Sequence, residues 1–414
     1  VEPQKPLSVK GKVEPMQTYL VQGVRTRSFR DESRGVAGVE THMVGRDAEF
    51  LFLQNTLQDV MADGALRVIT VVAEAGVGKS RLLFEFEQWA DELPEGIWYF
   101  KGRASPETEH QPYGLLRDML AARFNIIESD TLAEVRDKLQ EGIGSVKNGS
   151  ALLIGQLLGY DFSDDPAVKP LVDDPRQLRE QALAALASYF HQLAEQDLVM
   201  IFLEDLHWAD DSSLDTFNYL AQALAETNIV VLAASRPHLH QRRPHWGEGW
   251  TFHSRLDLRP LSKRAGRELI ADILQRIEQV PKSLEDMIIN GAEGNPFFVE
   301  ELIKMLIDDR VIDISDSENW QIDLEHLDQT QVPATLTGVL QARLDRLSAE
   351  ERSVLQKASV VGPVFWDRVV AALGQTSDGE NDEDEDLSAV NESLATLRFR
   401  EFVFRRETSA FEDA

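Results

Sequence analysis

The amino-acid sequence predicts an α/β protein, in which a parallel sheet with flanking helices is followed by helical segments. Two observations lead to this fold class. Between residues 42 and 261, short apolar runs typical of buried strands alternate with stretches of helical spacing, and this alternation indicates βαβ units. From residue 262 onward, the apolar residues follow helical spacing almost to the end.

The sheet is expected to contain four strong strands and one weaker one. The long span 104–196, between the second and third strands, has helical patterns with a Pro/Asp-rich break at residues 164–175. The expected strands are residues 68–72, 97–100, 198–203, 229–234 and, more weakly, 252–258.

A glycine-rich turn links the first strand to a helix. The segment AEAGVGKS, residues 73–80, follows the strand directly and precedes the amphipathic run 81–89. Backbone N–H groups of such a turn, together with a helix N-terminus, form a phosphate-binding loop, or P-loop. We expect Lys79 to reach the β- and γ-phosphates of ATP or ADP, and Ser80 to place its hydroxyl on Mg²⁺. The other predicted nucleotide contacts of this segment are Ala75, Gly76, Val77, Gly78 and Arg81.

The first glycine of the G-x-x-x-x-G-K-[ST] pattern is replaced by Ala73. An alanine forced to positive φ would cost roughly 1–2 kcal/mol. We therefore expect Ala73 to keep β-region dihedral angles, while Gly76 and Gly78 supply the close backbone approach.

Two carboxylates end the third strand. Adjacent residues on a strand point to opposite sides, so Glu204 is expected to support Mg²⁺ while Asp205 polarises the attacking water. The alternative is a helix N-cap at a strand-to-helix turn. The fourth strand ends in Arg236, which either approaches the γ-phosphate beyond the carboxyl edge of the sheet or lies in a surface loop.

Beyond the sheet we expect a helical lid and then a winged-helix-like domain that lacks its last strand. The winged-helix interpretation rests on several short helices before a strand-like alternation at 399–406, and the acidic run 378–386 is expected to form a solvated loop. The expected domains are 1–23 (tail), 24–41 (linker), 42–261 (core), 262–330 (lid) and 331–414 (winged helix).

Composition limits the classes of function. The formal net charge of -29 disfavours nucleic acid as a partner, no apolar stretch is long enough to span a membrane, and the absence of cysteine is compatible with a cytoplasmic protein. The chain starts at Val1 without a signal-peptide pattern, and we interpret it as a piece of a larger protein.

Two further groups of basic residues have alternative interpretations. His238, His240, His245 and His253 could suggest a metal site, but their spacing favours a polar loop. Arginines 398, 400, 405 and 406 could mark a nucleic-acid-reading wing, although we favour balance of the acidic run or salt bridges to neighbouring domains.

Five motifs in a fixed order resemble those of the signal-transduction ATPases with numerous domains, a group of AAA-like P-loop NTPases. The resemblance covers residues 42–414. The motifs are MVGRDAE at 43–49, the P-loop at 73–80, EDLHWAD at 204–210, SRP at 235–237 and GNPFFVEE at 294–301.

The resemblance implies further site residues. Val44, Gly45 and Arg46 would line the adenine and ribose side, and Pro296 would press on the base from the lid. The chain departs from the family at Ala73 and in the order Glu204-Asp205, where many members have Asp before Glu, so we expect slow turnover.

Trp208 and Asp210 extend the same acidic motif. We expect them to pack and to cap the following helix rather than to do chemistry.

Residues 1–23 resemble the extreme C-terminus of class III nucleotidyl cyclase domains. Two extended pieces surround a VKGK turn, and in that family a lysine of the turn touches substrate phosphates, which here is matched best by Lys10. The metal-binding aspartates of that family lie upstream of this segment, so cyclisation is not expected from it. A generic β-hairpin tail is the alternative.

The favoured function is an ATP- or ADP-operated regulatory switch with slow Mg²⁺-dependent hydrolysis, which controls an attached cyclase and answers to a C-terminal sensor domain. A second interpretation is an ATP-dependent transcription regulator with a DNA-binding winged helix. A third is a ring-forming motor ATPase, which would form nucleotide-dependent oligomers and borrow an arginine from a neighbour.

Overall fold

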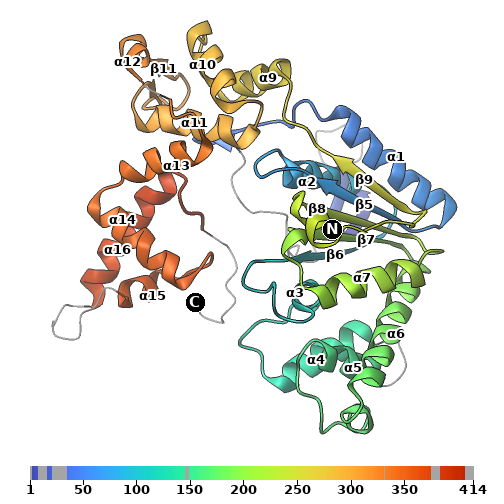
Figure 1. Ribbon diagram of the computed structural model, residues 1–414. Coiled ribbons are helices and arrows are strands. Elements are labelled where there is room, and N and C mark those ends of the chain that lie inside the picture. The colour runs from blue at the N-terminus through green and yellow to red at the C-terminus, as the bar shows by residue number, and fades with distance from the viewer. Residues whose placement is uncertain are drawn as a thin grey trace.

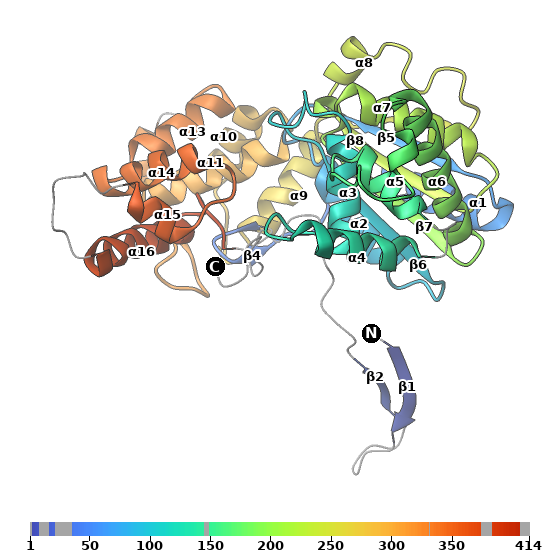
Figure 2. The same cartoon turned by 90° about the horizontal axis from the view of Figure 1, so that it is seen from below.

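A computed structural model gives the three-dimensional structure and describes residues 2–7, 16–20, 35–144, 149–330, 332–373 and 383–405. Figure 1 shows an α/β core, a group of helices beyond the end of its sheet, and a further helical region at the C-terminal end of the chain. Figure 2 shows the same parts from below.

The core contains a five-stranded sheet in the order β6-β7-β8-β5-β9, with every pair parallel. All five predicted strands are confirmed, with ends that differ by a few residues. Their bounds are β5 Arg67–Val72, β6 Ile97–Arg103, β7 Leu198–Glu204, β8 Ile229–Ser235 and β9 His253–Asp257.

The sheet is covered on both faces because successive side chains of its strands alternate between two apolar cores. In β7, Val199 and Ile201 join the core on one face, whereas Met200 and Phe202 join the core on the other. Every residue of β7 and β8 is buried, as is typical of parallel strands between two helical layers. One face is covered by α1 Asp47–Asp63 and α2 Lys79–Ala90, and the other by α3 Gly114–Phe124, α6 Pro175–Ala194 and α7 Asp211–Ala223.

The long connection between β6 and β7 is helical, as predicted. The expected break at 164–175 falls before α6, whose first turn is capped by Asp174, which accepts from the Gln177 N–H. The remaining elements of this connection are α4 Leu132–Ile143, α5 Ser150–Leu157 and the short 3₁₀ helix η1 Lys169–Leu171. A second 3₁₀ helix, η2 Leu206–Trp208, follows β7, and α8 His238–Arg242 follows β8.

Residues 262–330 form the segment that we call the lid. Its core is apolar and includes Leu269, Ile273, Leu302 and Leu306, all of which belong to the predicted helical spacing. Its elements are α9 Lys263–Ile273, α10 Lys282–Ala292, α11 Pro296–Asp308, the paired strands β10 Ile312–Asp313 and β11 Gln321–Ile322, and α12 Leu324–Gln329.

The structure differs from the expected linker over residues 35–40. These residues form a hairpin of β3 Gly35–Val36 and β4 Val39–Glu40. Val36 and Val39 are buried in the apolar core of the lid, a contact that the polar composition of 24–41 gave no reason to expect.

Residues 332–373 and 383–405 form the C-terminal helical region. Its helices are α13 Leu336–Asp345, α14 Ala349–Val361, α15 Asp367–Ala372 and α16 Glu383–Phe399. The prediction of a solvated loop over 378–386 is wrong for residues 383–386, because α16 already begins at Glu383. Residues 378–382 lie outside the described residues.

The predicted strand at 399–406 is wrong in its described part. Instead, α16 ends in a Schellman turn: the Phe402 N–H donates to the Leu397 carbonyl at 2.9 Å, and the Glu401 N–H donates to the Arg398 carbonyl at 3.0 Å. Glu401 has φ +58°, the left-handed conformation of this motif. The alternation that suggested a strand therefore reflects residues that turn back onto the lid.

A buried group of charges, which we call the α11 ion cluster, joins the lid to the C-terminal helical region. Arg343 of α13 contacts Glu301 at 2.5 Å and Asp308 at 3.0 Å, and its side chain is only 3% exposed. Arg400 also pairs with Asp308, at 3.2 Å, which confirms the favoured interpretation of this arginine as a salt-bridging residue. Lys304 completes the cluster by pairing with Glu301 and Glu401.

The N-terminal segment contains the antiparallel pair β1 Glu2–Leu7 and β2 Met16–Leu20. The first extended piece thus lies earlier than the sequence suggested. Lys10, Arg406 and most of the expected linker lie outside the described residues. In the part of the chain that the structure describes, no helix combines the length and apolar character that a membrane crossing requires.

Candidate nucleotide-binding site

The order of the strands brings the predicted site segments to one edge of the sheet. Strand β8 lies between β5 and β7, with Ser235 opposite Val72 and Ala233 opposite Leu203. The P-loop after β5, Arg236 after β8 and the carboxylates at the end of β7 therefore follow neighbouring strands. This edge is where open α/β sheets bind ligands.

The P-loop has the backbone that its sequence predicts. Gly76 and Gly78 have φ of +78° and +103°, which only glycine adopts without strain. Ala73 does not have positive φ, and its N–H donates to the Ser235 carbonyl at 3.1 Å. The prediction for Ala73 is confirmed, because this residue continues the strand ladder instead of turning.

Lys79 points back across the P-loop. Its ammonium donates to the carbonyls of Ala73 at 2.7 Å and Glu74 at 3.0 Å. Burial, with a further contribution from the Arg236 cation, lowers the pKa of Lys79 to about 8, although Asp205 and Glu74 act in the opposite direction. Two cations therefore lie close enough to repel each other, an arrangement that a polyphosphate would relieve.

A second observation supports a phosphate ligand at the P-loop. The N–H groups of residues 75–79 donate to no acceptor among the described residues. A Cβ added to Gly78 would meet nothing within 4 Å, so the space in front of this residue is open. Free amides in open space at the start of α2 suit the oxygens of a phosphate.

The acidic end of β7 carries a cation that the sequence analysis missed. Arg103, the last residue of β6, has its Nε 3.1 Å from Asp205 Oδ2 and 3.8 Å from Glu204 Oε2. β6 pairs with β7 in a register that sets Arg103 opposite Glu204. Asp205 itself has φ +53°, a conformation that costs an aspartate about 1 kcal/mol and marks candidate functional positions.

The donor set suits Mg²⁺, which prefers oxygen ligands. Glu204 is buried at the strand end, and Ser80 lies in the first turn of α2. Their roles as metal ligands remain predictions.

His207 is a buried side chain beside the two cations, and no role was assigned to it from the sequence. Its Nδ1 accepts the Arg236 N–H at 3.4 Å, while its Nε2 contacts no hydrogen-bond partner among the described residues. Burial lowers the pKa of His207 to about 4, so the ring is neutral at pH 7.

The Arg236 side chain is exposed, and no described carboxylate pairs with it, so the contact with the γ-phosphate remains a prediction.

Asp210 caps α7, as predicted for it. One carboxylate oxygen accepts the Ser213 N–H at 2.8 Å, and the other accepts the Ser213 hydroxyl at 2.6 Å. The same carboxylate also accepts the Tyr113 N–H at 2.8 Å, which ties α3 to this end of the sheet. Trp208 packs against the core on this face.

The residues predicted to line the adenine and ribose side of the nucleotide hold the P-loop and the lid together. Arg46 is buried, and its guanidinium donates to the carbonyls of Val77 at 2.9 Å and Arg259 at 2.8 Å. A Cβ on Gly45 would lie 2.6 Å from the Cβ of Ala265, so only glycine permits this approach of α9. Val44 packs against the lid core. These contacts are positional, and contact with a base remains a prediction for all three residues.

The lid touches the P-loop at the start of α11. The Phe297 N–H donates to the Gly76 carbonyl at 3.2 Å, and the Asn295 amide donates to the Ala75 carbonyl at 3.0 Å. Pro296, which was expected to press on the base, lies between these two residues. Asn295 and Phe297 belong to the GNPFFVEE motif, but the sequence alone gave no reason to expect these contacts.

The side chain of Arg81 makes its contacts within the protein. It pairs with Glu85 at 2.7 Å and donates to the Thr41 carbonyl, which fixes the segment that leads into α1. Its predicted contact with nucleotide remains untested.

The polar loop predicted for the histidines after Arg236 is wrong for His238 and His240, which lie in α8, and for His253, which begins β9. His245 lies in the segment between these two elements. The Nε2 of His253 lies 2.9 Å from the hydroxyl of Thr70, and His245 contacts Glu248. Within the described ranges, no group of three or more potential ligands is placed to hold a metal ion.

Comparison with known proteins agrees with this geometry. Residues 42–232 match the family model described as AAA ATPase domain. The chain contains a AAA-type ATPase domain. Residues 262–320, which form most of the lid, match a domain of unknown function, DUF8739.

The curated relatives are distant and match only part of this chain. An uncharacterized protein of Rhizobium meliloti is 23% identical over 77% of this chain and 30% of its own length. Adenylate cyclase type 10 of Oryctolagus cuniculus is 20% identical over 65% of this chain and 16% of its own. The solved structure of Cdc6p from Pyrobaculum aerophilum has a TM-score of 0.44, with 13% identity, and the match covers 90% of each chain. The chain spans less than a third of the length of the curated relatives that it matches.

Between the AAA-type ATPase domain and the lid, Glu300 makes stability depend on pH. This partly buried carboxyl of α11 lies near Glu301 and Lys304, and also near Arg81 of α2. Burial raises its pKa to about 7, with Glu301 adding to the rise and Lys304 opposing it. Between pH 4.5 and 7 the folded protein therefore keeps a proton that the unfolded chain has lost, so the free energy of unfolding falls as pH rises through this window.

We expect Glu300→Gln to flatten this dependence and to stabilise the protein at pH 8 by roughly 2 kcal/mol. Urea unfolding of the two proteins at pH 5 to 8 measures the difference. Glu180→Gln on the exposed face of α6 is the control, and it should leave the pH dependence unchanged. Equal slopes for Glu300→Gln and the unsubstituted protein would contradict the assignment.

Proposed function

We propose that this chain is a nucleotide-operated regulatory switch, in which ATP or ADP at the P-loop controls the position of the lid and the C-terminal helical region. One observation carries the proposal: α11 touches the P-loop through Asn295 and Phe297 at its first turn, and at its far end it holds the α11 ion cluster. A single rigid helix thus connects the candidate phosphate site to the last part of the chain.

The γ-phosphate supplies the difference between the two states of the switch. A ligand shifts a conformational equilibrium only by its differential affinity for the two arrangements. The carbonyls of Ala75 and Gly76 contact the lid, while the amides of the same loop are free for phosphate. Phosphate on those amides would alter the loop that α11 rests on.

Hydrolysis, in this proposal, is slow. Lys79 and the loop amides bind the phosphates, Asp205 orients water, and Arg236 responds to the γ-phosphate. Bound Mg²⁺, held by Ser80 and Glu204, would neutralise charge that develops on the phosphate oxygens. Arg103 forms an ion pair with Asp205 in the structure, so the carboxylate that would orient water is already engaged by a side chain, which supports slow turnover.

We further propose that the output is an attached adenylate or guanylate cyclase. The similarity to adenylate cyclase type 10 and the cyclase-like residues 1–23 support this assignment. The cytoplasmic location and the C-terminal sensor stay predictions of the same kind.

The switch can be tested by distance measurement between labels. Because the chain lacks cysteine, two introduced cysteines take fluorophores at defined positions. Glu180→Cys in the core and Val360→Cys in α14 change exposed side chains. We expect the energy transfer between them to differ between ATP with Mg²⁺ and ADP.

The matched control pair, Leu51→Cys with Glu180→Cys, lies within the core and should give the same transfer with either nucleotide. Identical transfer for the long pair in both nucleotides, with nucleotide bound, would exclude the switch while leaving the binding site intact.

A further inference from the structure

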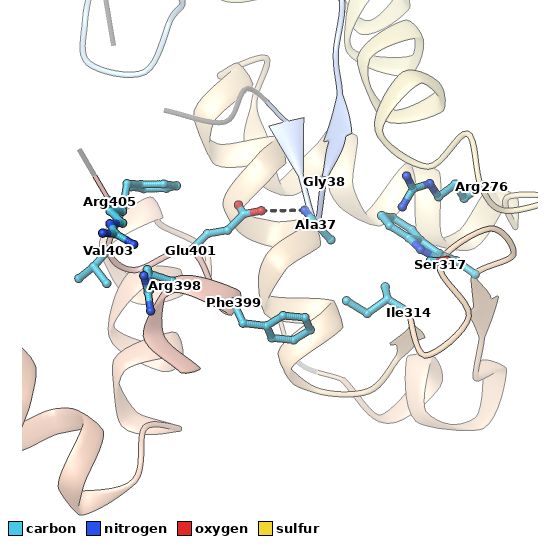
Figure 3. A pocket seen from close by; sticks show the side chains of 12 residues that line it. Ala37, Gly38, Arg276, Ile314, Ser317, Arg398, Phe399, Glu401, Val403 and Arg405 are labelled. Carbon is cyan, nitrogen blue, oxygen red and sulfur yellow. Dashed lines mark hydrogen bonds between the residues drawn. The ribbon is translucent and has the colours of Figure 1, made fainter. Parts of the chain in front are cut away.

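A cavity lies away from the P-loop, where three segments of the chain meet. It has a volume of about 380 Å³. Its walls come from the β3–β4 hairpin, from the lid around β10 and β11, and from the residues at and after the end of α16 (Figure 3). None of the residues that line it belongs to the P-loop or to the acidic strand end.

The charge at this cavity is positive, although the chain as a whole is strongly acidic. Arg276, Arg398 and Arg405 line it together with one carboxylate, Glu401. That carboxylate is already engaged, because it accepts the Ala37 N–H at 2.8 Å, as Figure 3 shows, and pairs with Lys304 at 2.9 Å. The three arginines therefore favour a ligand with negative charge.

Aromatic rings also give the cavity wall a flat apolar surface. Phe399 is 73% exposed, and its side chain points toward Ile314 of the opposite wall (Figure 3). Phe404 is 42% exposed, and the Arg276 guanidinium lies 5.6 Å from the ring centre of Trp320. Flat rings next to guanidinium groups suit a flat apolar body, because both can stack on it.

We propose that this cavity, defined by Arg276, Trp320, Arg398, Phe399 and Arg405, is a binding site for an organic anion with an aromatic body. Its volume lies within the usual range for small-molecule sites, roughly 300–1,000 Å³. The rings hold the apolar part and the arginines hold the acidic group. The nucleotide of the P-loop is a separate ligand at a separate site.

Such a ligand joins the lid to the C-terminal helical region. Arg276 and Trp320 belong to the lid, whereas Phe399 and Arg405 lie at the end of α16 and beyond it. A molecule that contacts both sides favours the arrangement in which they are together. If the proposed nucleotide switch holds, the anion and the nucleotide act on the same equilibrium.

The test uses a pair of probes that differ in charge. Anilinonaphthalene sulfonate is a fluorescent aromatic anion, and N-phenylnaphthylamine is its uncharged counterpart. Titration of the full chain without nucleotide should show one saturable site for the sulfonate. Arg398→Glu with Arg405→Glu should weaken sulfonate binding by about tenfold or more and leave the uncharged probe within about twofold, whereas Phe399→Ala should weaken both.

The control carries the same change of charge elsewhere. Arg176→Glu with Arg264→Glu alters two highly exposed arginines, on α6 and α9, and should bind both probes like the unsubstituted chain. Equal binding by the pocket variants and this control, or no saturable site, would overturn the proposal. Loss of the sulfonate site in Lys79→Met would also overturn it, since the probe would then occupy the P-loop. Failure of the nucleotide switch leaves these titrations unaffected.

Discussion

Replacing Lys79 by methionine is expected to weaken the binding of ATP and of ADP by about a hundredfold or more. The ammonium of Lys79 lies over the P-loop, bonded to the carbonyls of Ala73 and Glu74. Methionine keeps the length of the side chain and removes its charge, so the loop amides would have to bind a polyphosphate without their closest cation. Isothermal titration with ATP and Mg²⁺ measures the loss.

A lysine outside the site is the control for this substitution. Lys138→Met in α4 removes the same charge from an ion pair with Asp130 and should leave nucleotide affinity unchanged. Thermal unfolding of both variants without nucleotide shows whether the fold is kept. Unchanged affinity in folded Lys79→Met would remove the assignment of the site.

The second large effect is expected from Arg343→Met in the α11 ion cluster. This change leaves Glu301 and Asp308, both almost fully buried, without their main cation. Removing one partner of a buried ion pair costs about 3–5 kcal/mol, because the remaining charge stays away from water. We therefore expect the free energy needed to open the contact between the lid and the C-terminal helical region to fall by this amount. Hydrogen exchange of the α13 amides, followed by mass spectrometry, reports that opening.

Arg346→Met is a matched control on the neighbouring turn. Arg346 pairs with Asp309 at 2.6 Å, but its side chain is 34% exposed. Exposed pairs contribute roughly 0–1 kcal/mol, so exchange in α13 should change little. Similar protection in the Arg343 and Arg346 variants would mean that the α11 ion cluster does not hold the two regions together.

The strands and the P-loop could be predicted because their signals are local. Strand β7 is a continuous apolar run, and the segment from Ala73 to Ser80 fixes its own backbone through glycines. The end of α16 shows the limit of this reasoning. Residues 399–405 alternate like a strand, but Glu401 takes a left-handed turn and Arg400 reaches Asp308 of the lid, so the chain turns back.

The sequence by itself determined that a strand, a glycine-rich turn and a helix form a phosphate loop, because those residues are neighbours along the chain. Only the tertiary structure decided that Arg103 would pair with Asp205, that Asn295 would touch Ala75, and that three arginines of an acidic chain would share one cavity. Strand order and packing set these contacts between distant residues, and neither is encoded in the local spacing of apolar side chains.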